Sequence, residues 1–370
     1  MLNNYMAVLS LNEKENNIKS LTNCRPLCSI PIGGRYRIID FILSNLVNCG
    51  IDNIGLLTQF NSRSLVDHLG SGKPWDLNRK LGGLFVFNFG ITSSFASDIE
   101  ILKDNLEYLY RSKNEYVILS SSYMICNINF EEAAAYFEKS GADITIICKK
   151  TNHGRNSFLH CSVLNMDKSS KVLSVGENIG TEENLNISMD MLILKRKTLL
   201  DIIKRCIQTG FWESIKEWIY KNLNEYNVNA FEFKGYVGCI NSIASYYKVS
   251  MDMLNPQINR ELFFKNGQIF TKVMDEPPTR YFDSCNVHNS LVANGCMING
   301  TVENSIIARR VVVWEGAVIK NSIIMQNCEI KDNAVLYNVI MDKNNIIEEN
   351  KELKGDREYP LVIEKRKLSY

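Results

Sequence analysis

The stretch IIARRVVVWEGAVIKNSIIMQNCEIKDNAVL, residues 306–336, carries an aliphatic side chain at every sixth position: Ile306, Val312, Val318, Ile324, Ile330 and Leu336. No helix generates a six-residue period, whereas the hexapeptide coils of a parallel β-helix do. We therefore predict a β-helix of roughly three triangular coils, with small residues at its corners. The candidate corner residues are Gly316, Cys328 and Ala334. A run of β-hairpins is the alternative, although Asn-Gly turn pairs such as Asn299-Gly300 are scarce.

Upstream of this repeat the chain changes character. Residues 1–254 alternate β-branched runs with helical patterns, which is typical of an open, mostly parallel sheet covered by helices. We expect strands at residues 5–11, 53–58, 115–120 and 143–149, and helices at residues 36–49 and after the capping box that begins at Ser97. Residues 255–285 break the pattern and are predicted to connect this domain to the β-helix domain at residues 286–370.

The composition excludes several classes of protein. The chain has 370 residues, 42 Lys and Arg against 41 Asp and Glu, and a net charge of +1, which argues against a nucleic-acid partner. It shows neither a signal-peptide pattern nor 18 consecutive apolar residues, so we predict no membrane association. Its 11 cysteines include no C-x-x-C pair and fit reduced thiols in the cytoplasm.

Three segments carry a specific resemblance. They are SLTNCRPLCSIPIGGRYRIIDFILSN at residues 20–45, GIDNIGLLTQF at 50–60 and SLVDHLGSGKPWDL at 64–77. Together they resemble glucose-1-phosphate adenylyltransferase (ADP-glucose pyrophosphorylase). This family implies an α/β fold, a nucleotidyltransferase domain with a mixed sheet (GT-A-like, Rossmann-like), followed by a C-terminal left-handed parallel β-helix. Catalytic members make ADP-glucose and diphosphate from ATP and glucose 1-phosphate, with magnesium, for glycogen or starch synthesis.

The chain departs from the catalytic pattern at the nucleotide phosphates. Catalytic members follow their first strand with a G-G-x-G-x-R-L loop, whose glycines let backbone amides approach phosphate groups. Residues 12–17 read NEKENN here, without glycine and with two carboxylates, so we predict a solvated polar loop. The family's lysine a little downstream aligns with Leu27, which removes a cation that would neutralise phosphate charge.

The aligned metal and sugar-phosphate positions are also changed. The magnesium carboxylates of the family align with Ser122 and Cys239, which are poor magnesium ligands, and its sugar-phosphate lysine aligns with Asn178. We therefore predict no catalytic residue, no metal site and no cofactor in this chain. Phosphoryl transfer depends on charge neutralisation, so we expect turnover to fall roughly a thousandfold or more.

This combination resembles the noncatalytic, GlgD-type regulatory subunits of the family. The resemblance implies a catalytic adenylyltransferase subunit as partner, in a hetero-oligomer that is a tetramer, with magnesium bound by that partner. Two other hypotheses stay open: an active adenylyltransferase with altered ligands, and a hexapeptide-repeat acyltransferase or scaffold.

Basic residues provide candidates for an effector site. Arg25, Arg35 and Arg37 flank the Gly33-Gly34 turn, and the resemblance associates basic positions near this turn with phosphorylated metabolite effectors. Guanidinium groups bind phosphate through two hydrogen bonds. The alternative is that these arginines pair with acids such as Asp40 or Asp67. A second basic cluster, Lys365, Arg366 and Lys367, is predicted to be a solvated tail.

Overall fold

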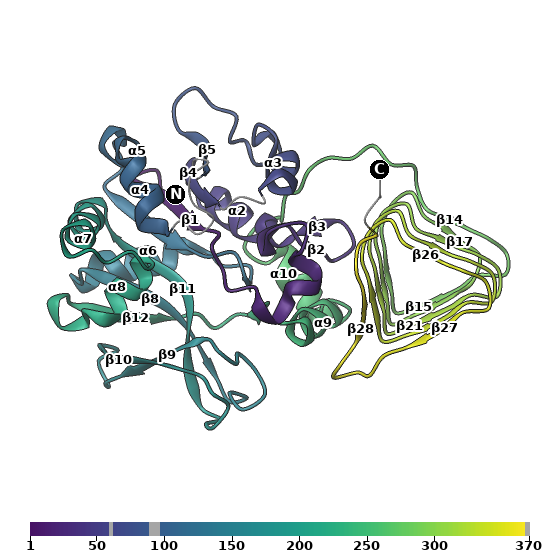
Figure 1. The fold of residues 1–370 in the computed structure, drawn as a ribbon. Helices are drawn as coiled ribbons and strands as arrows, with labels where there is room; N and C mark the ends of the chain where they lie inside the picture. Colours follow the sequence, from purple (N-terminus) through teal and green to yellow (C-terminus); the bar gives the residue numbers. More distant parts are fainter. Residues whose placement is uncertain (59–61, 89–96, 367–370) are drawn as a thin grey trace. The chain divides into compact units, whose positions relative to one another are not determined.

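The computed structural model describes residues 1–58, 62–88 and 97–366 (Figure 1). Gln59 and Phe60 of the 50–60 motif, and Lys367, lie outside these ranges. The chain forms two compact units, each assembled from segments that are distant in sequence. The first unit contains Met1–Glu13, Phe41–Val237 and Asn266–Ile269; the second contains Lys14–Asp40, Gly238–Lys265 and the segment that begins at Phe270. The boundaries of these units differ from the domain ranges given above, because Lys14–Asp40 and Gly238–Lys265 belong to the same unit as the β-helix.

A nine-stranded mixed sheet forms the first unit. Its strands are β1 (Tyr5–Ser10), β4 (Asn53–Thr58), β5 (Gly83–Asn88), β6 (Tyr116–Ser120), β8 (Ile144–Thr151), β9 (Ser162–Met166), β10 (Val172–Glu177), β11 (Leu185–Lys195) and β12 (Val228–Glu232). The order is β10-β9-β11-β6-β1-β4-β5, and β8 pairs with β11 and β12. The pairs β6–β1–β4–β5 and β8–β12 are parallel, whereas β11 runs antiparallel to β6 and β8. The mixed sheet is therefore confirmed, and the four predicted strands all form.

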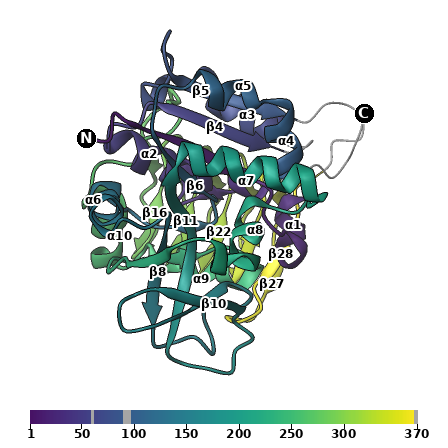
Figure 2. The ribbon, with the colours of Figure 1, turned by 90° about the vertical axis from the view of Figure 1, so that its left-hand side faces the viewer.

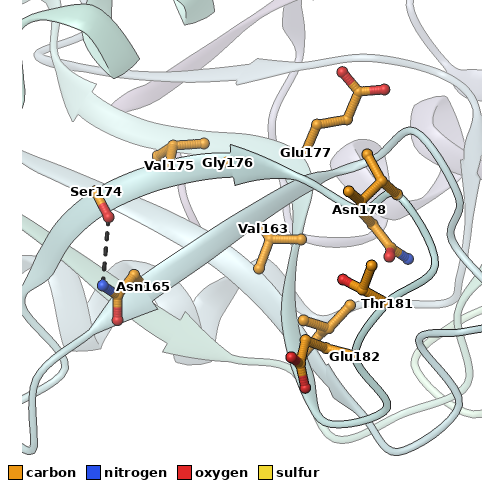
Figure 3. A pocket seen from close by; sticks show the side chains of 11 residues that line it. Val163, Asn165, Ser174, Val175, Gly176, Glu177, Asn178, Thr181 and Glu182 are labelled. Carbon is orange, nitrogen blue, oxygen red and sulfur yellow. Dashed lines mark hydrogen bonds between the residues drawn. The ribbon is translucent and has the colours of Figure 1, made fainter.

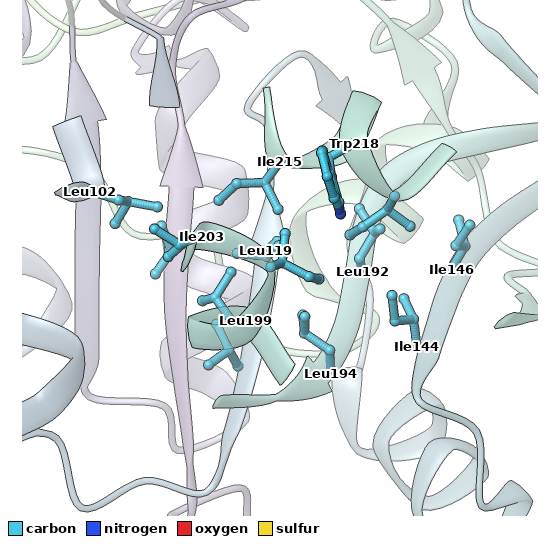
Figure 4. Close-up of a cluster of buried hydrophobic side chains, with 14 of the residues drawn as sticks. Leu102, Leu119, Ile144, Ile146, Leu192, Leu194, Leu199, Ile203, Ile215 and Trp218 are labelled. Atoms are coloured by element: carbon cyan, nitrogen blue, oxygen red, sulfur yellow. The ribbon is translucent and has the colours of Figure 1, made fainter. Parts of the chain in front are cut away.

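Helices cover this sheet and bury its apolar side chains. They are α2 (Ile38–Asn48), α3 (Arg63–Leu69), α4 (Asp98–Asp104), α5 (Leu106–Arg111), α6 (Phe130–Ser140), α7 (Arg196–Thr209) and α8 (Ile215–Lys221). Helix α7 lies across β6 and β11 (Figure 2). Leu199 and Ile203 of α7 belong to the same buried cluster as Leu119 of β6 and Leu192 of β11 (Figure 4). The capping box at Ser97 is present, but the helix breaks at Asn105, so one predicted helix becomes two.

The second unit contains the β-helix and the segments that pack with it. The segments before the repeat form α1 (Lys19–Thr22), η2 (Leu27–Ser29), β2 (Pro31–Ile32), β3 (Tyr36–Arg37), β13 (Gly238–Cys239), α9 (Ile243–Asp252) and α10 (Pro256–Phe264). The repeat forms three parallel sheets of five strands each. The first contains β14 (Arg280–Tyr281), β17 (Met297–Ile298), β20 (Val312–Val313), β23 (Glu329–Ile330) and β26 (Ile346–Ile347). The second contains β15 (Asn286–His288), β18 (Thr301–Glu303), β21 (Val318–Lys320), β24 (Val335–Tyr337) and β27 (Glu352–Lys354). The third contains β16 (Leu291–Val292), β19 (Ile306–Ile307), β22 (Ile323–Ile324), β25 (Val339–Met341) and β28 (Leu361–Ile363). This confirms the left-handed parallel β-helix, with five coils instead of the three predicted.

The register of the coils differs from a strict six-residue repeat. Strands β18, β21 and β24 (Thr301–Glu303, Val318–Lys320, Val335–Tyr337) stack with Val302, Ile319 and Leu336 in register, 17 residues apart. One side of each of these coils contains five residues instead of six, so residues six positions apart do not all face the core. Val312 and Val318 are half-buried, whereas Val313 and Ile319 point into the core.

Left-handed backbone forms the corners of the coils. Three stacked asparagines, Asn304, Asn321 and Asn338, have φ between 46° and 52°, a region that asparagine tolerates well. Gly316 is a corner residue as predicted, with φ of 70°. Cys328 and Ala334 each follow a turn and directly precede a strand, and their small side chains are buried in the core at these bends.

Within the described residues, no helix combines the length and the apolar character needed to cross a membrane.

The register can be tested with two neighbouring valines. We expect Val313→Ala to lower the free energy of unfolding by about 2 kcal/mol because it opens a cavity in the β-helix core. The matched control, Val312→Ala, removes a half-buried side chain and is expected to cost about 0.5 kcal/mol. Urea unfolding of both variants measures the difference, and an equal or larger loss for Val312→Ala would contradict the register.

Candidate functional site

Glu13 lies just beyond β1 and binds Ser122, which follows β6. The two strands are parallel neighbours, so their carboxyl ends lie at the same edge of the sheet, where α/β proteins of this kind bind ligands. Oε1 of Glu13 accepts hydrogen bonds from the backbone amide (2.8 Å) and the hydroxyl (2.6 Å) of Ser122. Ser122 is buried. The prediction of a solvated loop is therefore wrong at Glu13, whose carboxylate is hydrogen-bonded within the protein.

Glu15 makes a similar contact within the second unit. Its Oε1 accepts a hydrogen bond from the backbone amide of Leu27 at 2.8 Å, and the Leu27 side chain is fully buried. Burial raises the pKa of Glu15, and hydrogen bonds from Leu27 and Thr22 partly offset this effect. The two carboxylates of loop 12–17 thus bind backbone amides at two positions where the resemblance places catalytic side chains.

A third carboxylate, Asp98, lies beside this loop in the first unit. As the first residue of α4 it accepts hydrogen bonds from Ser10 Oγ (2.7 Å) and Asn12 Nδ2 (2.9 Å). Burial raises the pKa of Asp98, while these hydrogen bonds and the charge of Lys216 act in the opposite direction. Asn12 is therefore also held by the protein itself rather than by solvent.

Sequence reasoning missed a fourth carboxylate, Asp190. It lies at a register shift in β11, is only 4% exposed and has a left-handed φ of 53°. Its Oδ2 binds Lys216 Nζ at 2.6 Å and accepts a hydrogen bond from Tyr123 at 2.5 Å. Burial opposes the charged form of Lys216, yet the Asp190 carboxylate outweighs this and raises the pKa of Lys216. The available signal was an aspartate within the apolar run SMDMLILK, residues 188–195.

Asn178, aligned with the family's sugar-phosphate lysine, has a structural role. Its buried Nδ2 donates to the carbonyls of Gly154 (2.9 Å), Ser157 (3.0 Å) and Phe158 (3.0 Å), which closes a loop. It also borders a hollow of about 260 Å³ between β9, β10 and residues 178–185 (Figure 3). Two carboxylates, Glu177 and Glu182, line this hollow and no Lys or Arg does, so it does not suit a sugar phosphate.

The two aligned metal positions do not fit magnesium. Ser122 donates its hydroxyl hydrogen to Glu13, and Cys239 in β13 supplies a buried thiol. Magnesium prefers charged oxygen ligands, whereas thiols bind softer metals. Over residues 1–58, 62–88 and 97–366, no group of three or more His, Cys, Asp or Glu side chains is arranged to hold a metal ion.

The three candidate effector arginines have different surroundings. Arg25 is buried, forms an ion pair with Asp342 of the β-helix and donates from Nε to the carbonyl of Leu21 (3.1 Å). Arg35 is exposed, with its guanidinium 5.3 Å from the ring centre of Tyr36. Arg37 is half-buried. The pairing of Arg25 with Asp342, instead of Asp40 or Asp67, was not predictable because 317 residues separate the partners.

Lys343 adds an unpredicted cation to this region of the second unit. Burial lowers the pKa of Lys343 to about 7, together with the positive charges of Arg37, Arg25 and Lys365, while Asp342 acts in the opposite direction. Its ammonium has no hydrogen-bond partner among the described residues. Lys365 is half-buried, so the predicted solvated tail is wrong at that residue. We call Arg25, Arg37, Lys343 and Lys365 the basic cluster, because the positive charges of the other three oppose the charged form of Lys343.

Two family models match the chain. A nucleotidyl transferase model matches residues 17–255, and a GlmU-like C-terminal hexapeptide model matches residues 277–359. Together the matches reach both units.

Three relatives illustrate the similarity. The glycogen biosynthesis protein GlgD of Bacillus subtilis (strain 168) is 36% identical over 376 residues, covering 99% of this chain and 97% of that protein. GlgD of Geobacillus stearothermophilus is also 36% identical, with the same coverage of both chains. Glucose-1-phosphate adenylyltransferase of Mycoplasma mobile is 30% identical and covers 82% of this chain and 81% of that protein. These matches confirm the resemblance stated from the sequence.

The contact between Glu13 and Ser122 yields a test. Ser122→Ala removes one buried hydrogen bond and is expected to lower the free energy of unfolding by about 1 kcal/mol. Ser122→Asp places a second carboxylate against Glu13 and is expected to cost about 3 kcal/mol. In a Glu13→Gln background, the amide can donate to the new carboxylate, so we expect most of that extra loss to disappear. Urea unfolding of the double-mutant cycle measures this coupling, and an equal effect of Ser122→Asp in both backgrounds would contradict the contact.

Proposed function

The chain belongs to the nucleotidyl transferase family, and from this premise we propose that it is a noncatalytic regulatory subunit of glucose-1-phosphate adenylyltransferase. In this proposal it modulates the formation of ADP-glucose from ATP and glucose 1-phosphate. The names of the two GlgD relatives support a role in glycogen biosynthesis.

The observation that carries the proposal is the contact between Glu13 and Ser122. At the sheet edge, a carboxylate of the chain accepts the hydrogen bonds of the backbone amide and the hydroxyl at the aligned magnesium position. A negative charge at this place repels the phosphates of ATP. Leu27 and Cys239 add no cation and no carboxylate, so the groups that neutralise charge in phosphoryl transfer are missing together.

We propose a catalytic adenylyltransferase subunit as the partner, in a cytoplasmic hetero-oligomer of four chains in which the partner binds magnesium. The similarity to GlgD of Bacillus subtilis covers 99% of this chain, so both the sheet unit and the β-helix unit are retained. A fold that lacks catalytic groups can still supply surfaces for assembly with another subunit, which supports this role. The basic cluster is the proposed site for an anionic, phosphorylated effector, since a bound anion offsets the repulsion that the neighbouring positive charges exert on Lys343.

An activity assay tests the regulatory role. We expect the purified chain, given ATP, glucose 1-phosphate and magnesium, to release diphosphate at no more than about a thousandth of the rate of a catalytic subunit. Mixed with that subunit, it is expected to co-elute in size-exclusion chromatography and to change the effector response of the mixture. Robust turnover by the chain alone would favour the active-enzyme hypothesis, and failure to form a mixed oligomer would favour the scaffold or acyltransferase hypothesis.

Binding of sulfate tests the basic cluster, because sulfate keeps two negative charges between pH 6 and pH 8. The groups that face Lys343 are Arg25, Arg37, Asp342 and Lys365. With a pKa of about 7, Lys343 is charged at pH 6 and neutral at pH 8, so we expect sulfate to bind about tenfold more tightly at pH 6. Isothermal titration calorimetry measures both affinities.

Two lysine variants control this experiment. Lys343→Met is expected to abolish the difference between the two pH values. Lys320→Met removes an ion pair with Glu303 on another face of the β-helix and is expected to leave the difference unchanged. Equal affinity at both pH values in the unmodified chain would contradict an anion site at the basic cluster.

A further inference from the structure

Asp190 interrupts the pairing of β11 with a left-handed backbone. The register of β11 with β8 shifts between Ser188 and Met191, and Asp190 has a φ of 53° at this shift. Most residues with a side chain avoid this conformation, whereas glycine, asparagine and aspartate adopt it more readily. The position therefore accepts aspartate, and the buried contacts of its side chain hold the carboxylate in one place.

These contacts come from three separate elements of the first unit. Lys216 reaches Oδ2 from α8, and Tyr123 reaches the same oxygen from the segment that follows β6. Oδ1 lies 3.4 Å from Ser188 Oγ on β11 and 3.5 Å from the hydroxyl of Tyr220 on α8. These two hydroxyls are also hydrogen-bonded to each other at 2.8 Å, so one of them donates to Oδ1 at a time. An ammonium group and three hydroxyls thus surround one buried carboxylate.

The donors form the kind of site that binds an oxyanion. Ammonium and hydroxyl groups donate hydrogen bonds to carboxylate and phosphate oxygens alike, and the half-buried ammonium of Lys216 is stabilised by a negative partner. Among the described residues, Lys216 forms an ion pair only with Asp190. Tyr123, which donates a hydrogen bond to Asp190, directly follows Ser122 in the chain. The site therefore lies at the same sheet edge as the contact between Glu13 and Ser122.

We propose that Lys216, Tyr123, Ser188 and Tyr220 form an oxyanion pocket in which the Asp190 carboxylate is a built-in occupant that excludes small phosphate-type anions. The pocket is closed by the chain's own side chain, and the fold of the first unit does not depend on a bound anion. This inference deepens the proposed noncatalytic function and rests on it for its biological meaning, but the pocket itself is tested by binding alone.

Thermal unfolding with and without inorganic phosphate tests the pocket. Asp190→Gly removes the carboxylate, opens space and suits the left-handed backbone. In chloride buffer we expect its midpoint temperature to fall by roughly 5 °C or more, because Lys216 loses its partner. At 50 mM phosphate and matched ionic strength, we expect the variant to recover at least about 3 °C more than the unmodified chain gains.

Two further variants identify the site of that recovery. Asp190→Asn tolerates the same backbone and fills the same volume, so it is expected to lose stability without gaining a phosphate response. The double variant Asp190→Gly, Lys216→Met is expected to lose the response because the cation is gone. An equal phosphate shift in Asp190→Gly and the unmodified chain, or a shift that survives in the double variant, would overturn the proposal.

Refolding replaces this measurement if Asp190→Gly does not accumulate in folded form. Recovery of folded protein in phosphate but not in chloride supports the pocket, and no recovery in phosphate contradicts it. Neither result depends on turnover or on a partner subunit, so failure of the pocket and failure of the regulatory role are distinguishable.

Discussion

Carboxylates of the chain itself accept hydrogen bonds at the carboxyl edge of the parallel strands β1 and β6, and the arrangement of the first unit depends on these contacts. Glu13 binds the backbone amide and hydroxyl of Ser122, Asp98 binds Ser10 and Asn12, and Asp190 binds Lys216. A buried donor left without a partner costs about 1–3 kcal/mol. In a ligand-binding enzyme of this fold, the ligand can meet part of that need. Here carboxylates of the chain meet it at Ser10, Asn12 and Ser122.

Much of the fold was predictable because its signals are local. The strand Asn53–Thr58 and the helix that ends at Asn48 follow directly from apolar periodicity, and the capping box at Ser97 from four consecutive residues. The β-helix also follows from a period, but its register does not. A strict six-residue row places Val312 inside, whereas coils of 17 residues place Val313 there. A difference of one residue per coil decides which valine faces the core. Because both positions are apolar, the sequence alone does not reveal the register.

From the sequence, the candidate site was predictable only through residues that differ from the family's catalytic pattern. Alignment to the family pattern predicts that Leu27, Ser122, Asn178 and Cys239 occupy positions of catalytic side chains, since each difference from that pattern is visible in a single letter. What replaces the lost groups was not visible. The partners Glu13 and Ser122 are 109 residues apart, and Lys216 lies 26 residues from Asp190. Such contacts depend on strand order and on the register shift in β11, which a single sequence does not encode in any local pattern.

The charged side chains of the two units have different surroundings. In the first unit the half-buried Lys216 is paired with the buried carboxylate of Asp190. In the second unit Asp342 forms an ion pair with Arg25, while the nearby Lys343 has a pKa lowered to about 7 by burial and by like charges. Groups with strongly shifted pKa values are typical of functional sites, and an anion bound near Lys343 offsets the repulsion between these positive charges. This is the physical reason why the proposed effector site lies in the unit that contains the β-helix and not at the sheet edge of the first unit.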